Sequence, residues 1–193
     1  MSKLINTEVS QGLGYSGIVT LKLAQDNEII KQATIHNTGR IPLFSFFANC
    51  LAANWNAASA KFPSRIVIFS AETNETEFDS SKWSKTTAIT PDVGIMQANV
   101  PEIISDPKTD SCAVKYHFRI PTSLIGSSNA AEIGKIGLYS KNVTLADPLA
   151  YIFIDSETKT LVANASNNPN VVILLDWELT ISNKVVTNNT NNN

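Results

Sequence analysis

The chain has 193 residues, enough for one domain with a sizeable hydrophobic core and no need of disulfides. Its 15 Lys and Arg residues nearly balance 17 Asp and Glu residues, and charged residues make up 17% of the chain, below the roughly 25% usual in globular proteins. This balance argues against broad electrostatic binding to nucleic acid or to an anionic membrane, and no window approaches the roughly 18 apolar residues of a membrane span.

Residues 1–15 show weak hydrophobic periodicity, and we expect an N-terminal arm that orders against a neighbour, or else a first short strand. They lack the basic and then apolar run of a signal peptide, so the protein is expected to fold in a cytoplasm. From Ser16 the segment SGIVTLKL alternates apolar and polar residues, and a second such segment, EIIKQATIH, follows Asp26 and Asn27. This pattern predicts a β-hairpin.

The stretch PLFSFFANCLAANW, residues 42–55, has the clearest helical pattern in the chain. Its apolar residues recur at the i, i+3, i+4 and i+7 spacing of one helix stripe: Leu43, Phe46, Phe47, Cys50, Leu51 and Trp55. Pro42 suits the first helical turn, where its missing N–H would have no partner. We expect this stripe to be buried against strands.

The middle of the chain is less regular. The run RIVIFS, residues 65–70, predicts a strand buried on both faces. Residues 71–110 form an irregular excursion, and a long segment of this kind usually carries function or contacts a partner. Cys50 and Cys112 both fall on apolar faces, so we expect two buried thiols.

Two strand patterns in the C-terminal half carry charged residues on one face. In residues 112–120, Lys115, His117 and Arg119 alternate with apolar residues. Residues 171–182 form the longest alternating run, and Asp176 and Glu178 share its outward face. We predict that Lys115, Arg119, Asp176 and Glu178 form cross-strand ion pairs on neighbouring strands.

About seven or eight strands, with one α-helix at about residues 42–55, predict a mainly β fold, an antiparallel β-sandwich. The sandwich domain covers residues 16–183 and includes the excursion 71–110. It is preceded by the arm, residues 1–15. An Asn-rich tail, residues 184–193, is expected to be disordered unless a partner orders it.

Catalytic motifs are not supported. The G-x-G-x-x-G at residues 12–17 leads into a strand, whereas a dinucleotide site needs it to open a helix. His36 and His117 do not stand at metal-ligand spacing from a Cys, Asp or Glu. Asp176 and Glu178 lie about 7 Å apart by strand geometry, as in some glycosidases, but acids two residues apart are common on exposed strands. We expect no enzyme, no catalytic residues, no cofactor and no metal.

Trp83, within the segment TEFDSSKWSK, is the tryptophan that we expect near the surface, because Trp55 and Trp177 fall on core faces. An exposed aromatic ring can stack on a sugar. Trp83 is therefore the candidate surface ligand contact, and a carbohydrate-binding β-sandwich module for cell-surface recognition is the alternative function.

Three consecutive segments resemble structural proteins of tailed-bacteriophage virions, of the tail-collar, fibre or head-appendage type. The segments are FRIPTSLIGSSNAAEIGKIGLYS, LAYIFID and NVVILLDWELTISN. The residues that carry the resemblance are Glu132, Ile133, Gly137, Leu138, Tyr139, Trp177, Leu179, Ser182 and Asn183. The earlier segment HNTGRIPLFSFFANCLA is also similar to virion proteins.

The resemblance implies a non-enzymatic, multi-copy subunit of a virion, either a head fibre or decoration on the capsid or a tail appendage. Its implied partners are other virion proteins and copies of itself, with a trimer among the expected oligomers. A host glycan is a further implied partner, because a virion fibre can also recognise the cell surface. The implied location is the virion, after synthesis in the bacterial host cytoplasm. A low-charge, amide-rich surface avoids repulsion between identical neighbours, and linked sites need only modest affinity per contact.

Overall fold

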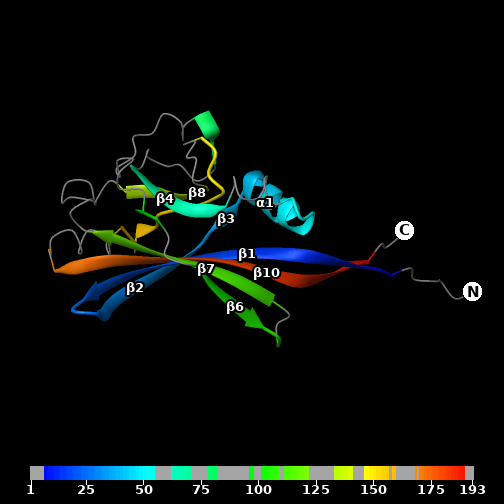
Figure 1. Cartoon of the computed structure of the whole chain (residues 1–193), viewed down its shortest axis with the longest axis horizontal. Helices are drawn as coiled ribbons and strands as arrows, with labels where there is room; N and C mark the ends of the chain where they lie inside the picture. The colour runs from blue at the N-terminus through cyan, green and yellow to red at the C-terminus, as the bar shows by residue number, and fades with distance from the viewer. Residues whose placement is uncertain are drawn as a thin grey trace, which may run out of the picture.

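The computed structural model describes residues 7–54, 62–70, 78–81, 96–97, 101–108, 111–121, 133–140, 146–156, 158–159, 168 and 170–189. Within them the chain forms two five-stranded sheets and one α-helix, α1 (Figure 1). Every pair of neighbouring strands is antiparallel. The predicted antiparallel β-sandwich is confirmed.

Sheet A has the order β2-β1-β10-β7-β6. Its strands span Glu28–His36 (β2), Thr7–Gln25 (β1), Val171–Asn189 (β10), Ser111–Pro121 (β7) and Glu102–Asp106 (β6). Sheet B has the order β3-β9-β8-β4-β5. Its strands span Thr38–Gly39 (β3), Ala150–Phe153 (β9), Ile133–Ser140 (β8), Pro63–Ser70 (β4) and Met96–Gln97 (β5). Eight of these strands have four or more residues, in agreement with the seven or eight strands predicted. The other two, β3 and β5, have two residues each.

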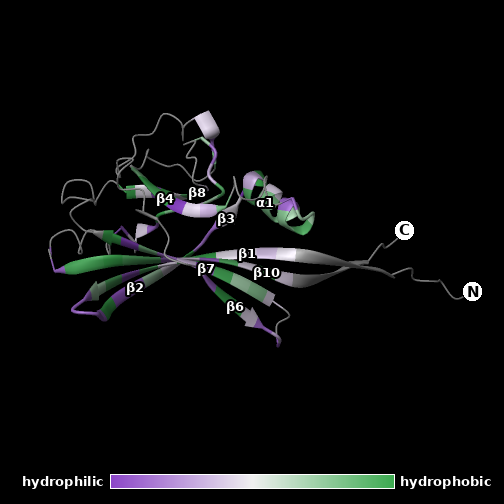
Figure 2. Ribbon diagram, in the orientation of Figure 1, coloured by the Kyte–Doolittle hydropathy of each residue, from purple (hydrophilic) through white to green (hydrophobic). Residues whose placement is uncertain are grey.

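The core lies between the two sheets. Sheet A contributes alternate residues of its central strands, and those of β10 are buried from Val171 to Leu179. Ile66, Ile68 and Leu138 face them from sheet B in the same hydrophobic cluster. Hydrophobic residues fill the first half of β10, whereas hydrophilic residues mark the turn of the β1–β2 hairpin (Figure 2). The period-2 alternation therefore places β10 at the centre of the core, as predicted.

The β1–β2 hairpin closes through a two-residue loop. Asp26 and Asn27 both have positive φ, 52° and 69°. Positive φ at both central residues defines a type I′ turn, and Asp and Asn tolerate this region better than most residues. The hairpin predicted from the sequence is therefore present, and its turn follows from these two residues.

Helix α1, Ile41–Leu51, is shorter than the predicted 42–55. Ala53 has φ 54°, the N–H of Ala53 bonds to the C=O of Cys50, and that of Asn54 bonds to the C=O of Asn49. These bonds form a Schellman motif, a common helix end that usually uses glycine. The helix therefore stops at Leu51, and Trp55 lies outside the described residues.

The stripe predicted on α1 is only partly buried. Leu43 is fully buried, and Phe46 and Phe47 pack against the core from half-buried positions. Leu51 is 76% exposed, so its predicted burial is wrong. The first two turns of the helix contact the core, and the last turn extends beyond it.

Cys112 is exposed and Cys50 is half-buried, so the prediction of two buried thiols is wrong. Cys112 has the same parity on β7 as the buried Tyr116 and Phe118. Its position lies at the end of β7 where the core no longer covers sheet A. The alternation of apolar and polar residues shows which face of sheet A a residue lies on. It does not show how far along β7 the core covers that face.

β4 is buried on both faces of sheet B, as the RIVIFS run predicted. The outer face of sheet B holds a second cluster of Val67, Phe69 and Tyr139. Phe78 packs against this cluster, with its ring centroid 5.3 Å from that of Tyr151. Phe78 belongs to the 71–110 excursion, so at least this part of the excursion covers the sandwich.

β1 and β10 pair without interruption, from Thr7 opposite Asn189 to Gln25 opposite Val171. β7 pairs with β10 only as far as Ser182. Residues 7–13 and 183–189 thus form a two-stranded extension beyond sheet A, which we name the terminal ribbon (Figure 1). Of the two alternatives expected for residues 1–15, an arm or a first short strand, residues 7–15 form a strand. Residues 184–189 also form a strand, where a disordered tail was expected over 184–193.

Asn37 joins the two sheets at the point where the chain leaves β2 for sheet B. Its backbone N–H donates to the C=O of Gly17 at 2.9 Å. In the orientation that satisfies every partner, its side-chain oxygen accepts the indole N–H of Trp177 at 2.8 Å, and its amide nitrogen donates to the Tyr15 hydroxyl. Asn37 thereby satisfies a buried donor at the centre of the core.

Gly17 leaves room for the Asn37 side chain. A Cβ at position 17 would lie 2.4 Å from Cγ of the Asn37 side-chain amide. We expect Gly17→Ala to displace Asn37, to leave the Trp177 N–H without its acceptor and to lower the free energy of unfolding by about 1–3 kcal/mol. Urea unfolding measures it. Ser16→Ala, at the exposed neighbouring position, is the control, and an equal effect of the two variants would contradict the explanation.

Candidate functional site

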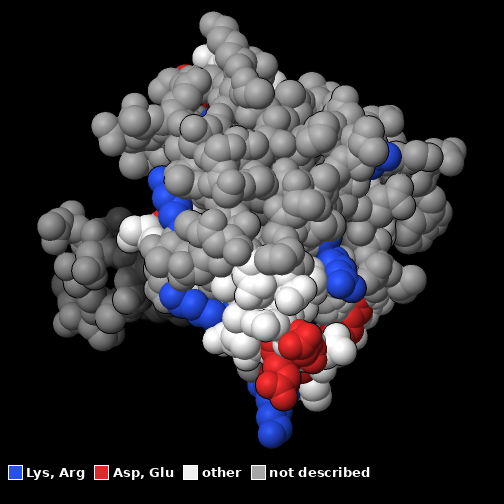
Figure 3. Space-filling model, turned by 90° about the vertical axis from the view of Figure 1, so that its left-hand side faces the viewer, with Lys and Arg blue, Asp and Glu red and all other residues white. Residues whose placement is uncertain are grey.

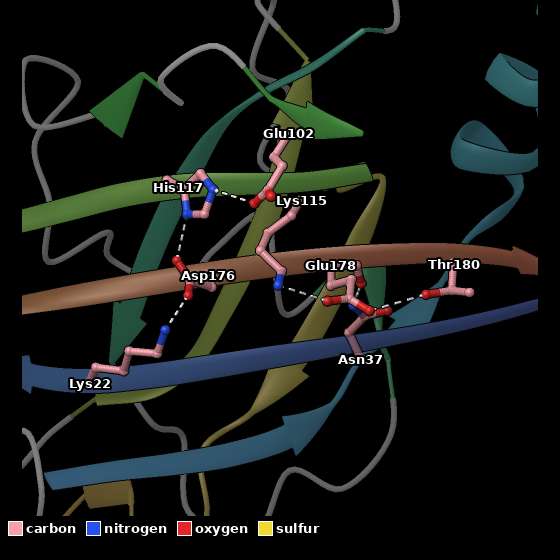
Figure 4. Close-up of polar contacts among 8 residues, drawn as sticks. All are labelled: Lys22, Asn37, Glu102, Lys115, His117, Asp176, Glu178 and Thr180. Atoms are coloured by element: carbon pink, nitrogen blue, oxygen red, sulfur yellow. Dashed lines mark hydrogen bonds and ion pairs between the residues drawn. The ribbon is translucent and has the colours of Figure 1, made fainter. Parts of the chain in front are cut away.

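Charged side chains of four strands meet on the outer face of sheet A (Figure 4). The register of β7 and β10 places His117 opposite Asp176 and Lys115 opposite Glu178. On β6, Glu102 lies opposite Lys115. We name the following set the polar network: Lys22, Glu102, Lys115, His117, Asp176 and Glu178.

Asp176 is the centre of the polar network. Its Oδ2 accepts a hydrogen bond from Nζ of Lys22 on β1 at 2.5 Å, and its Oδ1 lies 2.7 Å from Nδ1 of His117 on β7. Burial alone would raise the pKa of Asp176, but the hydrogen bonds and positive charges of Lys22 and His117 outweigh it and lower the pKa below its ordinary value. This carboxylate thus links three adjacent strands.

His117 lies between two carboxylates. Its Nδ1 contacts Asp176, and its Nε2 lies 3.6 Å from Oε2 of Glu102. A histidine held by an acid at Nδ1 has the orientation used in catalytic triads, but there Nε2 faces a hydroxyl or thiol. Here Nε2 faces a second acid, so the arrangement supports pairing between strands and not nucleophilic catalysis.

Lys115 and Glu178 form the second cross-strand pair. Nζ of Lys115 lies 3.2 Å from Oε2 of Glu178. The Thr180 hydroxyl donates to the other carboxylate oxygen, Oε1, at 3.3 Å. Both oxygens of Glu178 are therefore engaged within sheet A, and neither is directed to a ligand.

The structure brings together most of the residues predicted for the ion pairs. Lys115, Asp176 and Glu178 lie on neighbouring strands, whereas Arg119 lies opposite Leu174 and is exposed. Within the described part of the chain, Arg119 forms no ion pair with either acid. Asp176 pairs instead with His117 and with Lys22.

Lys22 was not predicted, because its position beside Asp176 depends on the pairing of the first and last strands. The alternation within residues 16–23 places Lys22 on the outward face. It does not show which strand lies alongside. Trp83, the candidate ligand contact, lies outside the described residues, and the carbohydrate hypothesis stays a prediction.

The remaining observations define no other chemical site among the described residues. No group of three or more His, Cys, Asp or Glu side chains there is arranged to hold a metal ion. No helix in this part of the chain is both long and apolar enough to cross a bilayer. Seen from the hairpin end, the described residues that are visible include both basic and acidic side chains next to uncharged ones (Figure 3).

Comparison of the chain with protein-family models, with characterised proteins and with solved structures found no match. Its function must therefore be inferred from the residues and geometry of this chain. In the described part of the chain, that geometry consists of a polar network whose charged groups pair with one another, a buried core and a terminal ribbon.

Asp176 makes stability depend on pH in a defined direction. A carboxylate with a lowered pKa in the folded state stabilises the fold above its unfolded-state pKa, and this contribution is lost as the pH falls through the folded-state pKa. We expect Asp176→Asn to be less stable than the unaltered chain at neutral pH. The difference should shrink below about pH 4. Unfolding midpoints across this range measure it, and a gap that stays constant would contradict the assignment.

Lys115 and Arg119 offer a matched pair of variants on one strand. Lys115→Met removes the partner of Glu178, and we expect a loss of about 0.2–1 kcal/mol, the usual range for partly exposed pairs. Arg119→Met removes an exposed charge that pairs with neither acid, and we expect less change. Chemical unfolding compares the two, and a larger loss for Arg119→Met would show that the register-based pairing is wrong.

Proposed function

We propose that this protein is a non-enzymatic structural subunit of a tailed-phage virion, present in many copies in a head fibre, a decoration or a tail appendage. It assembles through contacts with other virion proteins and with copies of itself. The resemblance of its last three strand segments to virion proteins provides the class. The terminal ribbon is the observation that supports assembly.

The terminal ribbon is hard to explain in a protein that acts alone. Strands usually have about five or six residues, and a two-stranded ribbon without further packing is marginally stable in water. Here both partners have 19 residues, and seven pairs, from Thr7–Asn189 to Leu13–Asn183, lie beyond the last residue of β10 that pairs with β7. A neighbouring subunit that pairs with the ribbon would supply the missing stabilisation.

Exposed apolar side chains give further support. Ile41 is 82% exposed on α1, and Ile103 is 72% exposed on β6, an edge strand of sheet A. Ile29 and Ile30 are more than half exposed on β2, the opposite edge strand. Large apolar residues at several separate places suit a subunit that meets more than one neighbour.

The polar network supports a structural role of sheet A. In its described contacts the acids and bases neutralise one another between strands. Such pairs fix strand register and leave little free charge to repel an identical neighbour. This arrangement suits a rigid building block better than a site that must bind and release a charged substrate.

Analysis of purified particles tests the proposal. We expect quantitative mass spectrometry of virions from the phage that encodes this chain to detect it in many copies per particle, retained after washing at high salt. A non-virion enzyme of the same phage serves as the control for contamination. Absence of the chain from the particles would overturn the proposal.

A further inference from the structure

β1 has a long edge without a neighbouring strand. β2 pairs with β1 from Ile18 to Gln25, and the N–H of Asn37 bonds to the C=O of Gly17. Between Thr7 and Gly17 no strand in the described part of the chain pairs with β1 on this side. We name residues 7–17 of β1, on the side away from β10, the free edge.

The free edge lacks the features that usually prevent edge strands from pairing with another chain. Natural edges are often protected by proline, by lysine or by a β-bulge. Residues 7–17 contain no proline and no lysine, and Glu8 is their one charged residue. The register with β10 runs without a shift along the whole of β1. The free edge is therefore a regular row of backbone donors and acceptors that ends at the C=O of Gly17, which Asn37 already occupies.

We propose that the free edge pairs with the same edge of a second copy of this chain, in antiparallel orientation about a two-fold axis. This inference rests on the proposed function, because it names the contact by which one subunit meets the next. Eleven residues in strand conformation extend about 36 Å. In a two-fold contact each copy contributes the same surface, so an unprotected edge is complementary to itself.

The shape of the molecule favours the antiparallel orientation. Paired strands lie about 4.8 Å apart, so parallel ribbons would force the two sandwiches into the same space. Antiparallel ribbons point in opposite directions and place the two sandwiches at opposite ends of a four-stranded sheet. The incoming strand would then lie end to end with β2 on the same side of β1, with the same antiparallel direction as β2.

An apolar contact lies beside the inner end of the free edge. The ring of Phe44 on α1 packs edge-to-face on Tyr15 of β1, with 5.5 Å between centroids, and Phe44 remains 45% exposed. A strand that ends near Gly17 would reach this ring. Backbone pairing along the edge and an apolar contact at its end together match the usual pattern of strand addition.

The edge of β10 is the competing surface. It lacks a neighbour in the described residues only over residues 183–189, because β7 pairs with β10 up to Ser182. It is shorter than the free edge and carries Lys184. Lysine is the charged residue most often found on protected edges, so this side is the weaker candidate.

Cysteine scanning of the purified full-length chain tests the inference. In a Cys50→Ser, Cys112→Ser background, single cysteines are placed at Ser10, Gln11, Gly12 and Leu13. A two-fold axis near the middle of the free edge brings one position, expected close to Gly12, opposite its own copy, within reach of a disulfide. Thr34→Cys, on exposed β2, and Asn188→Cys, on β10, are the matched controls.

We expect oxidation to link at least tenfold more dimer at one or two adjacent positions of the scan than at Thr34→Cys. The unmodified chain should have the mass of two 21.0 kDa copies in sedimentation. Gln11→Pro should raise the dimer dissociation constant at least tenfold without lowering the unfolding midpoint of the monomer. A monomer at every concentration, or preferential linking at Asn188→Cys, would overturn the inference.

The outcomes separate this inference from the proposed function. A monomeric chain that is nevertheless abundant in virions would refute the pairing of free edges and leave the virion role standing. A chain that forms a dimer linked through Gly12→Cys but is absent from virions would refute the virion role and leave the contact standing.

Discussion

The antiparallel pairing of β1 with β10 over 19 residues is the constraint on which the rest of the structure depends. It joins the two ends of the chain at the centre of sheet A, so β2, β7 and β6 can only add outside it. The inward row of β10 then supplies the core surface against which sheet B packs. Because this pair spans the whole sequence, its closure carries a large loop entropy that burial of residues such as Trp177 must offset.

The register of β10 with its neighbours places a buried amide–indole contact on the inner face of sheet A and charged pairs on its outer face. On the inner face it brings Trp177 beside Asn37 and Gly17, where one amide satisfies the buried indole donor. On the outer face it brings Asp176 between Lys22 and His117. A shift by one residue would exchange these faces and would bury the acids, so both the polar network and the core oppose register slippage.

Sequence patterns were sufficient for features that depend on local periodicity. Alternation identified β7 and β10, and Pro42 marked the start of α1. The end of α1 was not predictable, since Ala53 adopts a conformation usually taken by glycine. The terminal ribbon was missed because Val185 and Val186 stand alone in an Asn-rich tail, and their β preference acts only when β1 lies beside them.

The partial prediction of the polar network has a similar cause. Alternation showed which residues share a face, so Lys115 and Glu178 were both included in the predicted ion pairs, and the structure pairs them. It could not give the offset between strands, which places Arg119 opposite Leu174. Nor could it show that Lys22, more than 150 positions away in sequence, lies beside Asp176.

The position of β10 also has a consequence for synthesis on the ribosome. β10, at the centre of sheet A, follows every other described strand in the sequence, so β1 must wait for its main partner until all of these strands have been translated. A prematurely terminated chain lacks this central strand and exposes the inner rows of β1 and β7. Such fragments are open to aggregation and proteolysis.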